Sequence, residues 1–194
     1  MSIQIRAGLE DSQRAAAARL YWDAFGGKLG RVMGPEPKAL RFIERVIDPT
    51  HVFSAVNARG DVLGVIGFRS WRGSFVGGNQ ADMAAIYGRF GAAWRGFCLM
   101  TLARDLEPHS LLVDGLAVRA DHQSQGIGSA LIETLCAQAA ANGYKTLRLE
   151  VLARNIRARA LYARRGFAVE RQIRSRWTAL FFAFSSVQVM VRRL

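Results

Sequence analysis

The stretch LVDGLAVRADHQSQGIGSALIETL, residues 112–135, contains in one run a strand, a turn and the start of a helix. Mostly apolar residues continue to Val118, a charged turn occupies residues 119–125, and Gly126 and Gly128 open a helical pattern. Glycines let a backbone pass close to a ligand, and the first turn of a helix offers free N–H groups at its positive dipole end. The stretch therefore favours an anion site, typically for phosphate, and a pyrophosphate would fit there.

A second motif, NIRARALYARRGF at residues 155–167, begins 27 positions after Gly128 and reads N-x-x-A-x-x-L-Y-x-x-x-G-F. A G-x-G at a helix start on its own more often serves tight-turn geometry alone. Here Gln123, Gly126 and Gly128 stand at the spacing Q/R-x-x-G-x-G/A. Together the two motifs resemble the acetyl-CoA-binding core of the GNAT superfamily of N-acyltransferases, specifically over residues 111–167 and elsewhere mainly in the order of elements.

The resemblance implies acetyl-CoA as the acyl donor, with its pyrophosphate held by backbone N–H groups of the turn. Two positions depart from the family pattern, since Ser124 stands where many members carry glycine and Ala120 where proline is common. Neither change removes an N–H donor, so we expect the cofactor site to be intact. The residues implied to contact the cofactor are Leu116, Ala117, Val118, Gln123, Ser124, Gln125, Gly126, Ile127, Gly128, Ser129, Asn155 and Tyr162.

The last strand residues before the turn have an implied main-chain role. In the family, the main chain at Leu116 and Val118 bonds the pantetheine arm and points an N–H at the thioester carbonyl. Such a donor is aimed at negative charge that grows on the carbonyl oxygen during transfer. We expect the side chains themselves to be core, and Arg119 or Lys145 to lie near the phosphates, with a solvated turn arginine as the alternative for Arg119.

Tyr162 is the best single catalytic candidate. It lies seven residues after Asn155, so both project from roughly one face of a short helix. A phenol is protonated at neutral pH and can donate a proton to the departing thiolate, the role of the matching tyrosine in many relatives. The alternative is a core aromatic residue. Asn155 is at least a helix cap, and the resemblance adds a contact to the pantetheine or to a bound water.

A general base is harder to assign. Asp114 interrupts an apolar strand at a position where many relatives carry a glutamate that draws the amine proton through water, and burial would raise its pKa. A polar residue at the sheet edge, or one paired to an arginine, is the alternative. Glu150 is the second choice. His109 and His122 titrate in a suitable range, but a single loop histidine is usually only solvated.

The order of patterns predicts one domain over residues 1–194 with a GNAT fold. We expect a mixed, mostly antiparallel sheet of about six or seven strands flanked by helices, with a helical insert over about 72–110 before the central strand. The expected elements are strands at 3–7, 51–56, 62–71, 111–118, 146–151, 167–177 and 187–193, helices at 11–25, 36–46, within 83–103, at 126–142 and 155–166, and a loop at 26–37.

Composition narrows the choice of partners. The net charge of +12 is carried by arginines scattered from Arg6 to Arg193, which favours a phosphate-bearing ligand over a specific nucleic-acid partner. No metal-ligand cluster is visible, and Cys98 and Cys136 cannot build a disulfide framework. The first six residues lack a signal-peptide pattern, so we expect the cytoplasm. Charges interrupt residues 83–103, so no membrane span is expected, because a bilayer needs ~20 apolar residues.

Residues 178–186, TALFFAFSS, place four large apolar side chains between two predicted strands. Water cannot cover so apolar a loop without inviting association. A partner subunit, the insert or an apolar acceptor could cover it, and we favour a homodimer in which this segment and the insert of 72–110 pack across a two-fold axis. The resemblance implies that the acceptor is bound by 26–37 and 178–186, together with whatever the insert covers.

The activity expected is transfer of an acetyl group from acetyl-CoA to a primary amine, of a small molecule, in a direct ternary complex without a metal. The first alternative is acetylation of a protein or peptide, at its N-terminus or at lysine. It arises because LEV at 149–151 and the motif after it look similar to ribosomal-protein N-terminal acetyltransferases, although those compact enzymes generally lack the long insert. The second alternative is a non-catalytic acyl-CoA-binding regulatory module, against which Tyr162 speaks.

Overall fold

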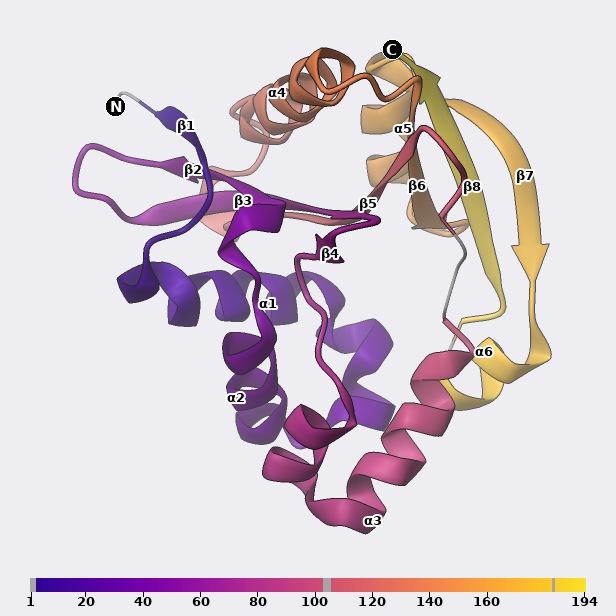
Figure 1. The fold of residues 1–194 in the computed structure, drawn as a ribbon. Coiled ribbons are helices and arrows are strands. Elements are labelled where there is room, and N and C mark those ends of the chain that lie inside the picture. Colours follow the sequence, from indigo (N-terminus) through magenta and orange to yellow (C-terminus); the bar gives the residue numbers. More distant parts are fainter. Residues whose placement is uncertain (1–2, 103–105, 183) are drawn as a thin grey trace.

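A mixed sheet with helices on both faces makes up the fold (Figure 1). The computed structural model describes residues 3–102, 106–182 and 184–194. The strands of the described residues are β1 (Gln4–Ala7), β2 (Val52–Val56), β3 (Val62–Ser70), β4 (Gly73–Ser74), β5 (Ser110–Val118), β6 (Thr146–Leu152), β7 (Ala168–Arg174) and β8 (Ser186–Arg193). They form one sheet in the order β1-β2-β3-β5-β6-β8-β7, with β4 paired to β3. Among the described strand pairs only β5 and β6 are parallel, as expected for a mostly antiparallel sheet.

The helices divide between the two faces of the sheet. They are α1 (Arg14–Met33), α2 (Glu36–Val46), α3 (Gln80–Met100), α4 (Ile127–Ala141), α5 (Ile156–Arg164) and α6 (Arg176–Phe182), with short 3₁₀ turns at Asp11–Gln13, Pro49–His51 and Ala120–His122. α4 and α5 cover one face, and the other four helices lie on the opposite face (Figure 1). As predicted, Leu147, Leu149 and Val151 on β6 share one face, packing toward α4 and α5.

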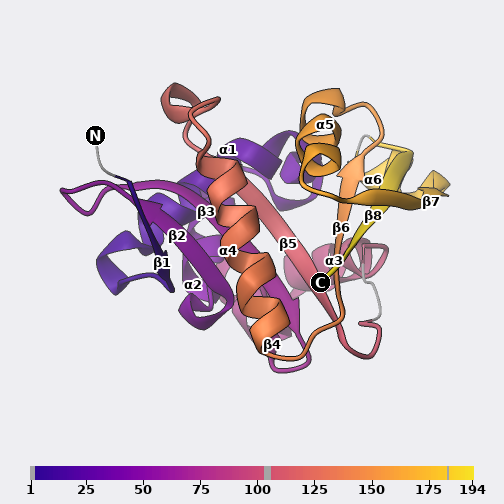
Figure 2. The ribbon, with the colours of Figure 1, turned by 90° about the horizontal axis from the view of Figure 1, so that it is seen from above.

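The centre of the sheet divides along its parallel pair. β5 and β6 are hydrogen-bonded only up to the pair formed by Val113 and Leu149. Beyond it β5 continues beside β3, and β6 continues beside β8, so the two strands diverge (Figure 2). We call the region beyond this last pair the split. In the split, the facing edges of β5 and β6 have no partner strand. On the face that carries α4 and α5, the split lies between these two helices.

The first helix corrects the predicted loop at 26–37. α1 continues through this glycine-rich stretch to Met33, and α2 begins at Glu36. Contacts from the insert complete the helix: the Tyr87 hydroxyl donates to the carbonyl of Met33 over 2.6 Å, and Arg95 donates to the carbonyl of Gly34 over 3.0 Å. Tertiary packing thus outweighs the low helix propensity of glycine.

The insert is helical, as predicted. α3 contains one non-helical residue, Gly88 with φ 73°, which divides it into two segments. Asn79 caps its start by accepting hydrogen bonds from the backbone of Ala81 and Asp82. Within the described ranges, no helix combines the length and the apolar character needed to cross a bilayer.

The C-terminal segment also departs from prediction. The strand expected over 167–177 ends at Arg174, and the expected loop at 178–186 contains most of the short helix α6. Phe182 and Phe184 are buried against the core on the α1 face. The Phe181 ring lies against Trp94 and Phe97 of α3, with centroid separations of 5.5 and 6.2 Å. The insert therefore covers part of this apolar segment, and Trp177 and Leu180 remain exposed.

Candidate active site

The turn before α4 has the geometry of an anion site. Gly126 is the N-terminal cap of α4 with a left-handed φ of 85°, and it offers no side chain to the N–H groups of the first turn. A Cβ added at Gly126 would meet nothing within 4 Å, so the space in front of the helix is open. Ser124 is also left-handed, with φ 64°. This explains why glycine suits that position in similar sequences.

Side chains of the turn stabilise it by hydrogen bonds and an ion pair to other residues of the turn and of β5. Gln123 donates to the last carbonyl of β5 over 3.1 Å, and Gln125 donates to the carbonyl of Asp121 over 3.3 Å. Arg119 forms an ion pair with Asp121 at 2.8 Å, and its guanidinium holds the pKa of that carboxyl at about 2. Lys145 lies beyond the C-terminal end of α4, the end opposite the turn, so the expectation that it contacts phosphate is wrong.

Arg157 is a residue of this region that the sequence motifs do not mark. Its Nη2 donates to the Ser124 Oγ over 2.7 Å, so it links the start of α5 to the turn before α4. It occupies an unspecified position of the N-x-x-A motif, where no pattern signals a role. Its exposed guanidinium adds a positive charge beside the open space at Gly126.

The backbone of β5 presents donors to the split. Arg119 donates its backbone N–H to Leu63 on β3 over 2.8 Å. Backbone N–H groups alternate in direction along a strand, so those of Leu116 and Val118 point away from β3, toward the split. Their side chains pack against the core beneath α4, while Ala117 is buried on the opposite face, in agreement with the expected core role.

A β-bulge sets the direction of Asp114. Gly67 and Phe68 are adjacent on β3 but pair with Gly115 and Val113, which leaves Asp114 as an extra residue on β5. A bulge of this kind bends the strand and re-aims a side chain. Asp114 therefore lies at the start of the split on the α1 face.

The surroundings of Asp114 combine burial with a cation. Its Oδ1 lies 3.4 Å from the guanidinium of Arg69, and its Oδ2 is buried with no hydrogen-bond partner among the described residues. Burial raises the pKa of the Asp114 carboxyl, although Arg69 and the nearby backbone of Phe75 and Val76 oppose the rise. Asp114 is thus paired to an arginine, as one of the two expectations has it, and its raised pKa is compatible with the other, a role as base.

Glu150 occupies the corresponding position on β6. It follows Leu149, the last residue paired to β5, just as Asp114 follows Val113. Alternation along β6 turns Glu150 to the α1 face, opposite Leu149. The fold therefore places both candidate carboxylates at the start of the split on one face of the sheet.

Tyr162 approaches from the other face. It lies on α5, is only 8% exposed, and packs against Phe167 with ring centroids 5.8 Å apart. Its hydroxyl makes no hydrogen bond to any residue that the structure describes. Burial raises the pKa of Tyr162 to about 12, so it carries its proton at neutral pH. Asn155 caps α5 as expected, accepting from the backbone of Ala158 over 3.1 Å.

The histidines lie outside this arrangement. His109 is exposed in the loop before β5, and His122 hydrogen-bonds to Asp121 within the turn. His51 is buried and joins Asp48 to Ser70, at 2.8 and 3.1 Å, which fastens the 3₁₀ turn before β2 to the end of β3.

Comparison with known proteins agrees with this geometry. The sequence model of the acetyltransferase (GNAT) family matches residues 14–167. The chain belongs to the GNAT acetyltransferase family. It is therefore an acyl-CoA N-acyltransferase, and the family generally uses acetyl-CoA as co-substrate. A search of curated protein sequences found no match to this acetyltransferase.

Solved structures share the fold of this GNAT acetyltransferase. A GCN5-related N-acetyltransferase from Kribbella flavida is 18% identical, with 99% of this chain and 98% of that chain covered and a TM-score of 0.64. The ribosomal-protein-S18-alanine N-acetyltransferase from Escherichia coli is 19% identical, with 99% and 94% covered and a TM-score of 0.63. At these identities the likeness shows the fold alone.

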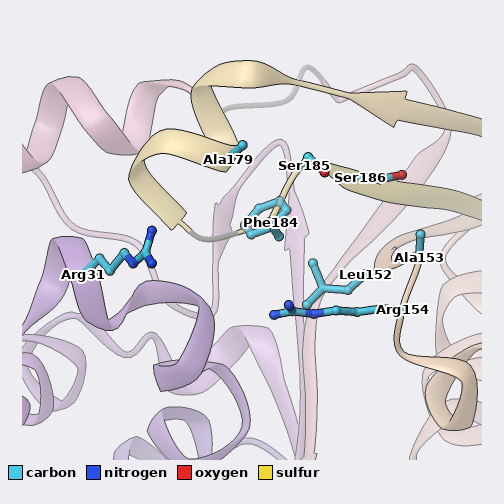
Figure 3. A pocket seen from close by; sticks show the side chains of 8 residues that line it. All are labelled: Arg31, Leu152, Ala153, Arg154, Ala179, Phe184, Ser185 and Ser186. Carbon is cyan, nitrogen blue, oxygen red and sulfur yellow. The ribbon is translucent and has the colours of Figure 1, made fainter.

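A cavity of about 460 Å³ opens beside the split of this acetyltransferase (Figure 3). It lies between the last turns of α1, the end of β6, and residues 184–186 before and at the start of β8. Its lining residues are Arg31, Leu152, Ala153, Arg154, Ala179, Phe184, Ser185 and Ser186. The segments expected to bind the acceptor, 26–37 and 178–186, both contribute lining residues to this cavity.

Proposed function

We propose that this protein transfers an acetyl group from acetyl-CoA to a primary amine of a small molecule, directly within a ternary complex. One observation carries the proposal. The split has a phosphate-binding turn beside it, two carboxylates on one face, and a tyrosine hydroxyl without a partner among the described residues on the other. No other described part of the chain gathers these groups.

The residues present fit acetyl-CoA. Open space at Gly126, first-turn N–H groups without a side-chain cap and the neighbouring Arg157 suit a pyrophosphate. The backbone N–H groups of Leu116 and Val118 face the split, where they suit the pantetheine arm and the thioester carbonyl. When bound, acetyl-CoA supplies the acetyl group as an activated thioester.

The chain supplies the proton transfers. Asp114, with its raised pKa and unpartnered Oδ2, accepts the proton from the amine, and Glu150 is the second candidate for that role. Tyr162 donates its hydroxyl proton to the departing sulfur. Because these groups come from opposite faces of the sheet, the amine and the thioester can meet in the split between them.

The cavity supports a small acceptor. Its volume of about 460 Å³ lies in the range of small-molecule sites, roughly 300–1,000 Å³. Two alternatives stand behind this proposal: acetylation of a protein or peptide, the activity named for the Escherichia coli structure, and acyl-CoA binding without catalysis.

The proposal is tested in two steps. Calorimetry with acetyl-CoA measures binding, and release of free thiol is then followed with a panel of small amines and, separately, of peptides. We expect binding and turnover of small amines. Turnover of peptides alone would favour the protein-acetylation alternative, and binding without any turnover would favour the regulatory module.

We also infer the setting in which the enzyme works. Cys98 and Cys136 are free and buried, which suits a reducing compartment, and we place the protein in the cytoplasm as one domain over residues 1–194. Half-exposed apolar side chains of α3 and α6 form what we call the aromatic patch: Trp94, Phe97, Trp177, Leu180 and Phe181. We propose that two copies pair through it.

A further inference from the structure

We infer that the acceptor amine carries an anionic group, a carboxylate or a phosphate, which Arg31 and Arg154 hold in the cavity beside the split. The inference rests on the proposed acetyl transfer and adds the class of the substrate. It depends on three features of the cavity: two exposed arginines without partners among the described residues, a lining without acidic residues, and a position at the end of the strand that carries Glu150.

Arg31 and Arg154 differ from most other arginines that flank the core. In the described part of the chain, neither side chain forms a hydrogen bond or an ion pair. By contrast, Arg148 is paired with Glu107 and Glu170. A guanidinium is always charged and presents a planar fork of N–H donors, which matches a carboxylate or a phosphate oxygen pair.

The two arginines reach the cavity from different elements. Figure 3 shows Arg31 extending from the last turns of α1 and Arg154 extending from the end of β6, with the Phe184 ring between and above them. Lys28, one helical turn before Arg31, places its Nζ 5.0 Å from the centre of the Phe184 ring. Arg31 and Arg154 therefore reach the cavity on either side of the Phe184 ring.

The lining offers no acidic partner to Arg31 and Arg154. The other lining residues are small, apolar or hydroxyl-bearing, and none is acidic. An acceptor that brings its own negative charge would pair with these exposed guanidinium groups, whereas a polyamine or a lysine side chain would add like charge. The Phe184 and Leu152 side chains offer apolar contact to the carbon chain that joins the two ends of such an acceptor.

The cavity lies at the end of the strand that carries Glu150. Leu152 lies two residues beyond Glu150 on the same face of β6, which is about 7 Å along a strand. Arg154 follows two positions beyond Leu152, and its long side chain lines the same cavity. Amino acids and phosphoamines carry both an amine and an anionic group, so they fit this description.

The test uses matched acceptors at saturating acetyl-CoA. Each of several amino acids is compared with its amide, and O-phosphoethanolamine is compared with ethanolamine. We expect kcat/KM to be roughly tenfold or more higher for the anionic member, because charge-assisted hydrogen bonds are made to it alone. Preference among carboxylates and the phosphoamine then identifies the anion.

Variants assign the preference to the two arginines. Arg31→Gln and Arg154→Gln should each raise KM for the anionic acceptor roughly tenfold, with little change in kcat, in KM for the neutral partner, or in the Kd of acetyl-CoA. Arg41→Gln, an exposed position on α2, is the matched control for loss of one charge and should behave as wild type.

A second readout does not need turnover. With acetyl-CoA bound, inorganic phosphate should raise the Tm of the wild type more than that of the Arg31→Gln, Arg154→Gln double variant. Equal rates for charged and neutral acceptors would overturn the inference and leave acetyl transfer standing. A raised Kd for acetyl-CoA in the variants would also overturn it, by assigning the arginines to the donor. If no amine is turned over while phosphate still raises the Tm of the wild type more than that of the double variant, the proposed function is wrong and the anion site stands.

Discussion

At the scale of single residues, the hydroxyl of Tyr162 is the group whose removal tests the chemistry most directly. Tyr162→Phe keeps the buried ring against Phe167 and removes only the proton donor. We expect kcat to fall on the order of 10²-fold, a typical general-acid contribution, with the Kd of acetyl-CoA and the Tm little changed. Steady-state kinetics and calorimetry measure both quantities, and a normal kcat would assign Tyr162 to the core alone.

Asp114 links catalysis to stability through its pKa. The unfolded carboxyl ionises near pH about 4, while the folded one holds its proton to higher pH, so folding stability falls as pH rises through that window. Asp114→Asn removes this loss, and Arg69, a third exposed, stays solvated without its partner. We expect kcat/KM to fall on the order of 10²-fold or more, and the free energy of unfolding not to fall at neutral pH.

Urea unfolding of both proteins at about pH 5 and about pH 8 checks the sign, because the difference between wild type and Asp114→Asn should grow in favour of the variant at the higher pH. Wild-type kcat/KM should rise with pH as the carboxyl ionises. A variant that is active, or that is less stable at the higher pH, would remove Asp114 as the base.

The sequence could identify residues that motifs mark, and it missed residues that only the fold brings together. Asn155 is the cap that its position predicts, and Gly126 has the left-handed φ that a glycine at a turn suggests. Arg157, Arg31 and Arg154 carry no local signal, because the roles proposed for them depend on neighbours on other elements. In a chain with this many arginines, sequence alone does not separate these three from the rest.

At the scale of elements, substitutions at the turn before α4 test acetyl-CoA binding separately from the stability of the helix. Gly126→Val places a β-branched side chain in the open space before the helix and at a φ of 85°, so we expect acetyl-CoA binding to be lost. The strain costs on the order of 1–3 kcal/mol, which a folded domain of this size tolerates. Calorimetry with acetyl-CoA and a thermal melt measure the two effects separately.

Gly128→Ala is the matched control. The atoms nearest to a Cβ at Gly128 belong to the side chains of Leu116, Leu161 and Val118, at ordinary contact distances of 3.6–3.8 Å. Alanine within a helix is favoured over glycine by roughly 0.5–1 kcal/mol. We expect a small rise in Tm and retained acetyl-CoA binding. If Gly126→Val binds acetyl-CoA as tightly as Gly128→Ala, the turn is not the phosphate site.

Periodicity predicted the elements that carry their own pattern. The strands flanking the split and the helix after Gly126 repeat their apolar residues at the spacing of one face, and they form as predicted. The prediction was wrong at the glycine-rich end of α1, because local helix propensity there favours a loop. A Cβ at Gly26 would lie 2.9 Å from the Trp22 ring, so glycine serves packing at that position. Likewise α6 is defined by contacts to α1 and α3, which no local pattern shows.

At the scale of the whole molecule, the aromatic patch predicts self-association. Phe97 and Leu180 are 55% and 63% exposed, so replacing both by aspartate should leave the fold intact and place charge within the patch. Light scattering should give twice 21.4 kDa for the wild type and 21.4 kDa for the double variant. Phe90→Asp, at a position of α3 that is 95% exposed and lies outside the patch, is the control. A wild type that is monomeric at micromolar concentration would contradict the dimer.

The hydrogen bonds between α3 and the end of α1 couple the local unfolding of these two segments. The carbonyls of Met33 and Gly34 receive their hydrogen bonds from Tyr87 and Arg95, which lie more than fifty positions later in the chain. We therefore expect the last turns of α1 and the insert to open together, so that their amides exchange with solvent as one cooperative unit. Because Arg31 lies in those last turns of α1, we expect a local unfolding event that frees the insert to remove one wall of the cavity between α1, β6 and β8 as well, and the turn at Gly126 to stay folded.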